Sequence, residues 1–189
     1  MQILRLAYNV LVTPKLTAKI NFLKSNGIKN PSLAFFSDQK DTPWLSQGSL
    51  KADFPLTFLP SNVVQCGPIY LSSAPASEQD PEIANWLKRA PTIFINLGSH
   101  TAYTEPAASE IILALKEAIN TYNVQVLWKF NKQSNYSDDF LLPVKDEIAD
   151  GRIKMEKWIQ ADPAALLETG NVILFVHHGG SSGYHEAVA

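Results

Sequence analysis

The chain has 189 residues, of which 46% are hydrophobic and 18% are charged, and its formal net charge is −2. This composition excludes global disorder, and the charge gives no electrostatic support for binding nucleic acid or an anionic membrane. The single cysteine, Cys66, excludes an internal disulfide and is typical of a reducing compartment. No apolar run approaches a membrane span, and Met1–Pro14 lacks a signal-peptide pattern, so the sequence predicts a cytoplasmic protein without a transmembrane segment.

The first seventy residues show few patterns of regular structure. Apolar residues at helical spacing predict a helix over Pro14–Ser25, which ends at Asn26-Gly27. Apolar residues alternate at the start of Phe54–Ile69, but the three prolines of that segment favour edge strands and bends. The small, polar, proline-bearing segment Leu71–Asp80 is interpreted as a linker or domain boundary.

Predicted strands and helices alternate after residue 80. In chain order they are a helix at Pro81–Arg89, a strand at Thr92–Leu97, a helix from Thr104 or Glu105 to Asn120, a strand at Val124–Lys129, a weak helix near Val144–Ala149, a strand at Ile153–Met155, a helix at Pro163–Glu168, a strand at Asn171–Val176 and a helix after Gly179-Gly180. This alternation predicts an α/β fold, a parallel Rossmann-like sheet with helices on both faces. Trp44, Trp86 and Trp128 are predicted to be core residues.

The turn after the last predicted strand could hold an anion. Ligands of doubly wound sheets bind beyond the carboxyl ends of the strands, where this chain has His177-His178-Gly179-Gly180-Ser181-Ser182. Glycines let backbone N–H groups approach an anion, the following helix presents its positive end, and His178 and the serines add donors. A diphosphate suits such a turn. Glycine and serine also cap ordinary helices, so a purely structural turn is an equal alternative.

Several segments resemble the donor-binding half of the UDP-glycosyltransferases, which are inverting enzymes of two Rossmann-like domains. The motif His177-His178-Gly179-Gly180 is similar to that of fungal-type members. In matching order the segments are Phe94–Ser99, Val126–Trp128, Trp158–Pro163, Leu166-Leu167, Phe175–Gly180 and Glu186-Ala187. The resemblance implies that residues 1–70 are the tail of an acceptor domain, 71–80 a linker and 81–189 a partial donor-binding domain. It implies hexosyl transfer from a UDP-sugar, which is a substrate and no cofactor, to the hydroxyl of an unidentified small-molecule acceptor.

The resemblance also implies a set of donor-binding residues. They are Gly98, Ser99, Trp158, His178, Gly179, Gly180, Ser182, Gly183 and Glu186. Trp158 would stack on the uracil ring and Glu186 would bind the ribose hydroxyls, whereas Ser99, His178 and the start of the last helix would face the phosphates. Family members usually have Asn then Ser where this chain has Ser182 and Gly183, so two phosphate-side donors are altered.

No catalytic residue is assigned. The family's base is a histidine near the start of the acceptor domain, and no histidine here matches it by motif, so the sequence leaves activity of this chain undecided. We expect the chain to be a fragment of a UDP-glycosyltransferase that carries mainly the donor-binding half of the enzyme. The alternatives are a non-catalytic nucleotide-sugar-binding module and a non-functional truncated product. A module for another nucleotide is disfavoured because Leu97–Thr101 lacks G-x-G-x-x-G. The spacing of His178 and His185 does not suit a metal-ligand pair, so no metal is predicted.

Overall fold

A computed structural model describes residues 14–28, 42–48, 55–69 and 74–188 of the chain. The chain divides into two compact units, Met1–Trp44 with Leu59–Val64 and Leu45–Phe58 with Gln65–Ala189. The predicted functional residues all belong to the second unit.

Helix α2 spans Pro14–Ser25, which confirms the helix predicted from the apolar spacing. Leu16, Ile20 and Leu23 are half-buried, whereas the other residues of the helix are exposed. The chain leaves the helix at Gly27, whose φ of 82° lies in the left-handed region. Glycine adopts this conformation without the steric penalty of a Cβ, so the sequence stops the helix where the pattern predicted.

Strands β1 (Trp44–Ser46) and β2 (Val63–Gln65) form a two-stranded sheet. Among the described residues of Phe54–Ile69, only β2 is a strand, and Leu56 and Phe58 are exposed outside it. The prolines of this segment lack the N–H that a neighbouring strand would bind, which limits pairing to the short stretch between them.

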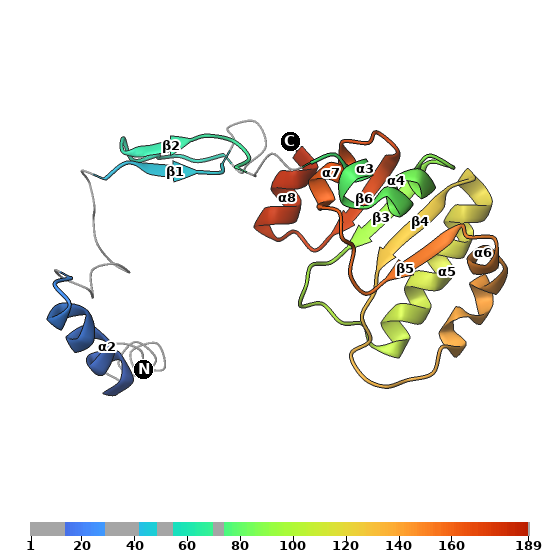
Figure 1. The fold of residues 1–189 in the computed structure, drawn as a ribbon, viewed down its shortest axis with the longest axis horizontal. Helices are drawn as coiled ribbons and strands as arrows, with labels where there is room; N and C mark the ends of the chain where they lie inside the picture. Colours follow the sequence, from blue (N-terminus) through green and yellow to red (C-terminus); the bar gives the residue numbers. More distant parts are fainter. Residues whose placement is uncertain (1–13, 29–41, 49–54, 70–73, 189) are drawn as a thin grey trace. The chain divides into compact units, whose positions relative to one another are not determined.

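A four-stranded parallel sheet lies at the centre of the second unit, in the order β5-β4-β3-β6 (Figure 1). Its strands are β3 (Thr92–Asn96), β4 (Gln125–Lys129), β5 (Ile153–Glu156) and β6 (Val172–His177). In the register, Phe94 lies between Leu127 of β4 and Phe175 of β6. Because all pairs are parallel, the carboxyl ends of the four strands meet at one edge of the sheet.

Helices cover both faces of this sheet. They are α3 (Ala76–Gln79), α4 (Pro81–Leu87), α5 (Glu105–Tyr122), the 3-10 helix η2 (Asp139–Val144), α6 (Lys145–Ala149), α7 (Pro163–Leu167) and α8 (Ser181–Val188). One core cluster joins α5 and η2 to Ile93 and Trp128, and the other joins α3, α4 and α7 to Phe94 and Leu127. Neighbouring residues of a strand point to opposite faces, so the predicted α/β fold with helices on both faces is confirmed. None of the helices that the structure describes is long and apolar enough to cross a membrane.

The predicted core tryptophans differ in their burial. Trp128 is fully buried and Trp86 is 8% exposed, which confirms both predictions. Trp44 is 50% exposed, so its predicted core position is wrong. Trp128 and Trp86 belong to the two core clusters, in which helices pack against the four-stranded sheet. Trp44 starts a strand of a two-stranded sheet, and such a sheet has too few neighbouring residues to enclose an indole.

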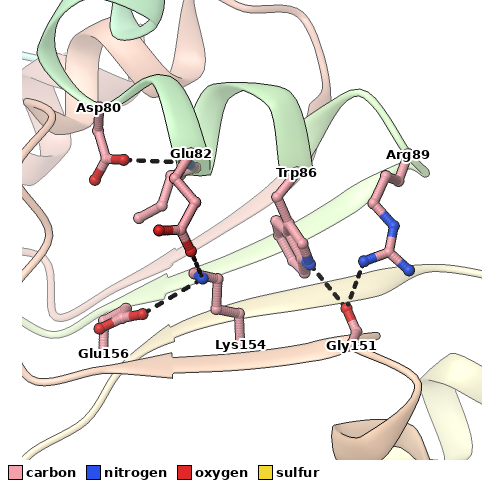
Figure 2. Close-up of polar contacts among 8 residues, drawn as sticks. Asp80, Glu82, Trp86, Arg89, Gly151, Lys154 and Glu156 are labelled. Atoms are coloured by element: carbon pink, nitrogen blue, oxygen red, sulfur yellow. Dashed lines mark hydrogen bonds and ion pairs between the residues drawn. The ribbon is translucent and has the colours of Figure 1, made fainter.

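Polar contacts attach helix α4 to β5 and the turn before it (Figure 2). Asp80 caps the start of the helix, and the carboxylate of Glu82 pairs with the ammonium of Lys154 at 2.5 Å. The Trp86 Nε1–H donates to the carbonyl of Gly151 at 2.8 Å. These contacts hold α4 against the edge strand of the sheet.

The segment 71–80, predicted as a linker, contains helix α3, and its residues 71–73 lie outside the described residues. Ala76 is buried in the same cluster as α4 and α7, and the Gln79 side chain accepts a hydrogen bond from the Asp162 N–H at 2.9 Å. The second half of the segment is therefore packed on the sheet. The division into an acceptor-domain tail, a linker and a partial donor domain stays a prediction.

Candidate functional site

A cleft of about 480 Å³ opens at the carboxyl edge of the sheet. Seven of the nine predicted donor-binding residues line this carboxyl-edge cleft: Gly98, Ser99, Trp158, His178, Ser182, Gly183 and Glu186. The other two, Gly179 and Gly180, do not line it and form the turn between β6 and α8. The structure therefore gathers residues from the turns after β3, β5 and β6 around one cavity.

The turn after β3 brings Ser99 to the cleft. The side-chain oxygen of Asn96 accepts the N–H of Gly98 at 3.0 Å, and the Thr101 hydroxyl donates to the carbonyl of Leu97 at 2.6 Å. Gly98 has a φ of 87°, which an L side chain rarely adopts. The resulting turn leaves Ser99 exposed at the cleft, with its hydroxyl 3.2 Å from Nδ1 of His100.

The imidazole of His178 lies between the turns that follow β3 and β6. A Cβ built on Gly98 would approach Cε1 of this ring to 3.1 Å, and one built on Gly180 would approach the same atom to 2.7 Å. Glycine at both positions is what allows the ring to lie so close to the two backbones. The fold therefore sets the position of His178 from two sides.

Helix α8 presents its amino-terminal end to the cleft. Its first intrahelical bond is donated by the Tyr184 N–H to the carbonyl of Gly180 at 3.0 Å. Ser182 and Gly183 precede that bond and line the cleft. The N–H groups of a first helical turn have no acceptor within the helix and carry a partial positive charge, so this end of the cleft favours an anion.

Trp158 follows β5 and lines the cleft from the side of that strand. Its side chain is 61% exposed, in contrast to the buried Trp128 and Trp86. The ammonium of Lys129 lies 4.3 Å from the centroid of the indole. An exposed indole beside a cavity offers a flat apolar face to a planar ring.

Glu186 lies in the second half of α8 and lines the cleft together with Asp162. Burial raises the pKa of Glu186, the negative charge of Asp162 raises it further, and His177 lowers it. A half-buried carboxylate is a hydrogen-bond acceptor that suits a diol. The raised pKa shows that the folded protein holds this charge at some energetic cost.

Other residues that line the cleft were not assigned from the sequence, among them Lys129, Phe94 and Phe175. Lys129 is the last residue of β4, and Phe94 and Phe175 stack with ring centroids 5.1 Å apart. Lys129 could have been found from the rule that ligands bind beyond the carboxyl ends of parallel strands. The two phenylalanines carry no such signal, because an apolar residue within a strand is typical of a core. Among the described residues, no group of three or more His, Cys, Asp or Glu side chains is arranged to hold a metal ion.

The fold defines a class of protein. The structure resembles a UGT transferase from Siraitia grosvenorii that was crystallised in complex with UDP, with a TM-score of 0.51 and 21% sequence identity. The match covers 67% of this chain and 30% of that one. The fold of the sheet unit is thus one found in UDP-glycosyltransferases. Apo UGT2 of Phytolacca americana matches with a TM-score of 0.47 and 23% identity, over 68% of this chain and 29% of that one.

The sequence comparison gives a closer relationship. The chain is 36% identical over 182 residues to the glycosyltransferase sdnJ of Sordaria araneosa, which covers 92% of this chain and 35% of the relative. The chain therefore spans about a third of the length of this curated relative. No protein-family model matches. These relationships agree with the family predicted from the motifs: the chain is similar, over most of its length, to part of a glycosyltransferase, and it has a fold found in UDP-glycosyltransferases.

Proposed function

We propose that the carboxyl-edge cleft binds the UDP part of a UDP-sugar, and that the chain is the donor-binding part of an enzyme that transfers a hexosyl group to an acceptor hydroxyl. One observation carries this proposal. Residues that were matched to the family from three separate turns line a single cleft at the edge of a parallel sheet. Its volume of about 480 Å³ lies within the range of small-molecule sites.

Each part of UDP, the uracil ring, the ribose and the diphosphate, has a chemically suitable partner among the residues of the cleft. Trp158 offers an exposed indole for the uracil ring, and Glu186 offers a carboxylate for the ribose hydroxyls. Ser99, His178 and the start of α8 supply donors and positive potential for the diphosphate. A planar base, a diol and an anion thus each have a complementary partner.

The same arrangement would assist the departure of UDP. When the acceptor oxygen attacks the anomeric carbon, the bond from that carbon to the β-phosphate oxygen breaks and the negative charge of UDP increases. His178 and the N–H groups of Ser182 and Gly183 would stabilise this charge, because donors fixed in place need little reorganisation. These groups would supply the positive charge that the leaving UDP requires, so we propose neither a cofactor nor a metal ion for this step. No residue is assigned as the base that removes the acceptor proton.

Calorimetric titration of the chain with UDP, ADP and NAD tests the proposal. We expect UDP to bind more tightly than ADP, because the phosphate contacts are shared and only the pyrimidine suits the indole platform. ADP or NAD binding as tight as UDP binding would contradict the uracil assignment. Acceptor-dependent release of UDP from a UDP-sugar separates an enzyme from the second candidate function, a module that binds nucleotide sugars without transfer.

A further inference from the structure

Lys129 and Trp158 form one wall of the carboxyl-edge cleft. Strands β4 and β5 pair in parallel with Lys129 opposite Glu156, which brings the end of β4 beside the segment that carries the indole. The ammonium of Lys129 lies 4.3 Å from the centroid of the Trp158 ring. Among the described residues, no carboxylate lies within ion-pair distance of Lys129, so the indole is the partner that the structure gives this ammonium.

This contact restricts how the indole can be used. An indole has two faces, and a cation over one of them is attracted by the ring quadrupole. Trp158 nevertheless remains 61% exposed and lines the cleft, so much of its side chain is accessible to a ligand. With the Lys129 ammonium over one face of the ring, a planar ligand would stack on the other face.

We propose that Lys129 is a positioning residue, which fixes the orientation of the Trp158 indole through a cation–π contact and leaves one face for a planar ring of the ligand. The inference deepens the proposed function and rests on it. Lys129 acts here through Trp158, so it strengthens binding of the nucleoside part of the ligand and has no separate effect on the phosphates. It lies on a β-strand, which is a more rigid support than the loop that carries Trp158.

The competing role for Lys129 is direct pairing with the diphosphate. The two roles predict different results with uridine and UDP. If Lys129 positions the indole, the substitution Lys129→Gln weakens uridine and UDP binding by the same factor. If Lys129 pairs with phosphate, UDP binding falls much more than uridine binding, and the loss decreases with added salt.

The experiment is a double-mutant cycle with Lys129→Gln, Trp158→Leu and the double variant, measured by calorimetry with uridine and UDP. We expect Lys129→Gln to weaken binding of both ligands about two- to fivefold, the range of a cation–π contact at an exposed site. In the Trp158→Leu background the same change should have no effect. Lys129→Arg should restore the affinity, because a guanidinium also stacks on an indole.

A matched control and a structural readout complete the test. Lys157→Gln removes the same charge next to Trp158 in the chain, but no cation–π contact of Lys157 is found among the described residues, so it should leave both affinities unchanged. The indole Nε1–H resonance of Trp158, identified by its loss in Trp158→Leu, should shift and broaden in Lys129→Gln without ligand. The indole resonance reports on the contact between Lys129 and Trp158 even if a variant changes the stability of the protein.

The outcomes separate the inference from the proposed function. A Trp158→Leu variant that binds UDP normally would overturn the stacking on which both depend. Weak binding by Trp158→Leu with unchanged binding by Lys129→Gln would overturn the role of Lys129 alone. An equal loss in the Trp158→Leu background would also overturn it, because Lys129 would then act independently of the indole. A loss specific to UDP would overturn it and assign Lys129 to the phosphates.

Discussion

The imidazole of His178 packs directly against the backbone of Gly98, although the two residues belong to turns that follow different strands, β3 and β6. A Cβ on Gly98 would lie 3.1 Å from Cε1 of His178, closer than an ordinary van der Waals contact. The pairing of β3 with β6 brings the two turns together, so the position of the ring depends on the sheet and on the absence of a side chain at Gly98.

This contact gives the first prediction. Gly98→Ala should move the His178 ring and weaken UDP binding about ten- to a hundredfold, comparable to the loss of a hydrogen bond to a charged group, about 1.5–3 kcal/mol. Gly170→Ala is the matched control, because Gly170 has a similar φ of 71° but a Cβ added there would meet no atom within 4 Å. Both changes should lower the free energy of unfolding by about 1–2 kcal/mol, the steric penalty of a left-handed residue. Equal UDP affinities of the two variants, measured by calorimetry, would show that Gly98 does not position the ring.

Trp158 should be required for ligand binding and dispensable for folding. Base stacking on an aromatic side chain is worth about 1–3 kcal/mol by alanine substitution, so Trp158→Ala should weaken UDP binding about tenfold or more. The melting temperature should change little, because the indole is 61% exposed. Trp44→Ala, which removes another exposed indole that does not line the cleft, should leave UDP binding unchanged. A lower melting temperature with unchanged UDP affinity would instead assign Trp158 to packing.

The ionisation of Glu186 should oppose folding at neutral pH. Burial and Asp162 raise the pKa of Glu186 above its usual value of 4.5, so the folded chain binds this proton more tightly than the unfolded chain does. The free energy of unfolding should therefore increase as the pH falls through the raised pKa, and this gain should be complete below the unfolded value. Denaturation of the wild type and Glu186→Gln at several pH values measures the effect as a difference between the two curves. A wild-type chain that loses stability relative to Glu186→Gln over this range would contradict the prediction.

Protonation of Glu186 should also weaken binding of the ligand. The neutral carboxyl accepts hydrogen bonds from the ribose hydroxyls less strongly than the carboxylate does. We expect uridine affinity to decrease over the same pH range in which the protein becomes more stable. The uridine affinity of Glu186→Gln should be lower at neutral pH and should lack this pH dependence. A parallel rise of stability and affinity on acidification would show that Glu186 does not contact the nucleoside.

The attachment of α4 to the sheet should affect stability but not the site (Figure 2). Trp86→Phe keeps most of the apolar contact but removes the N–H that donates to the Gly151 carbonyl. The free energy of unfolding should fall by about 1 kcal/mol, because the part-buried Gly151 carbonyl loses its shorter hydrogen bond and keeps only the 3.5 Å contact with Arg89. Glu82→Gln should change it little, since the Glu82 side chain is exposed and its pair with Lys154 is screened by water. Denaturant titration measures both changes, and UDP affinity serves as the control that should stay constant.

Much of the local structure of this chain follows from the sequence alone. The apolar spacing of α5 and the strand patterns around Phe94 and Trp128 predict these elements to within a few residues. Helix α5 continues to Tyr122, two residues beyond the predicted end, and closes with Asn123 at a φ of 51°. The sequence pattern underestimated this helix because the apolar spacing ends before the residue that adopts the left-handed conformation.

The composition of the cleft was only partly predictable. The motifs marked His178, Trp158 and Glu186 because these segments resemble those of a known family. The position of Lys129 over the indole and of Gly98 against His178 depends on the strand order β5-β4-β3-β6. Hydrophobic periodicity reports which face of an element is buried, but it does not report which strand lies beside it. The sequence therefore determined the elements and the residue types at their ends, and the pairing of β4 with β5 and of β3 with β6 decided which of those residues meet.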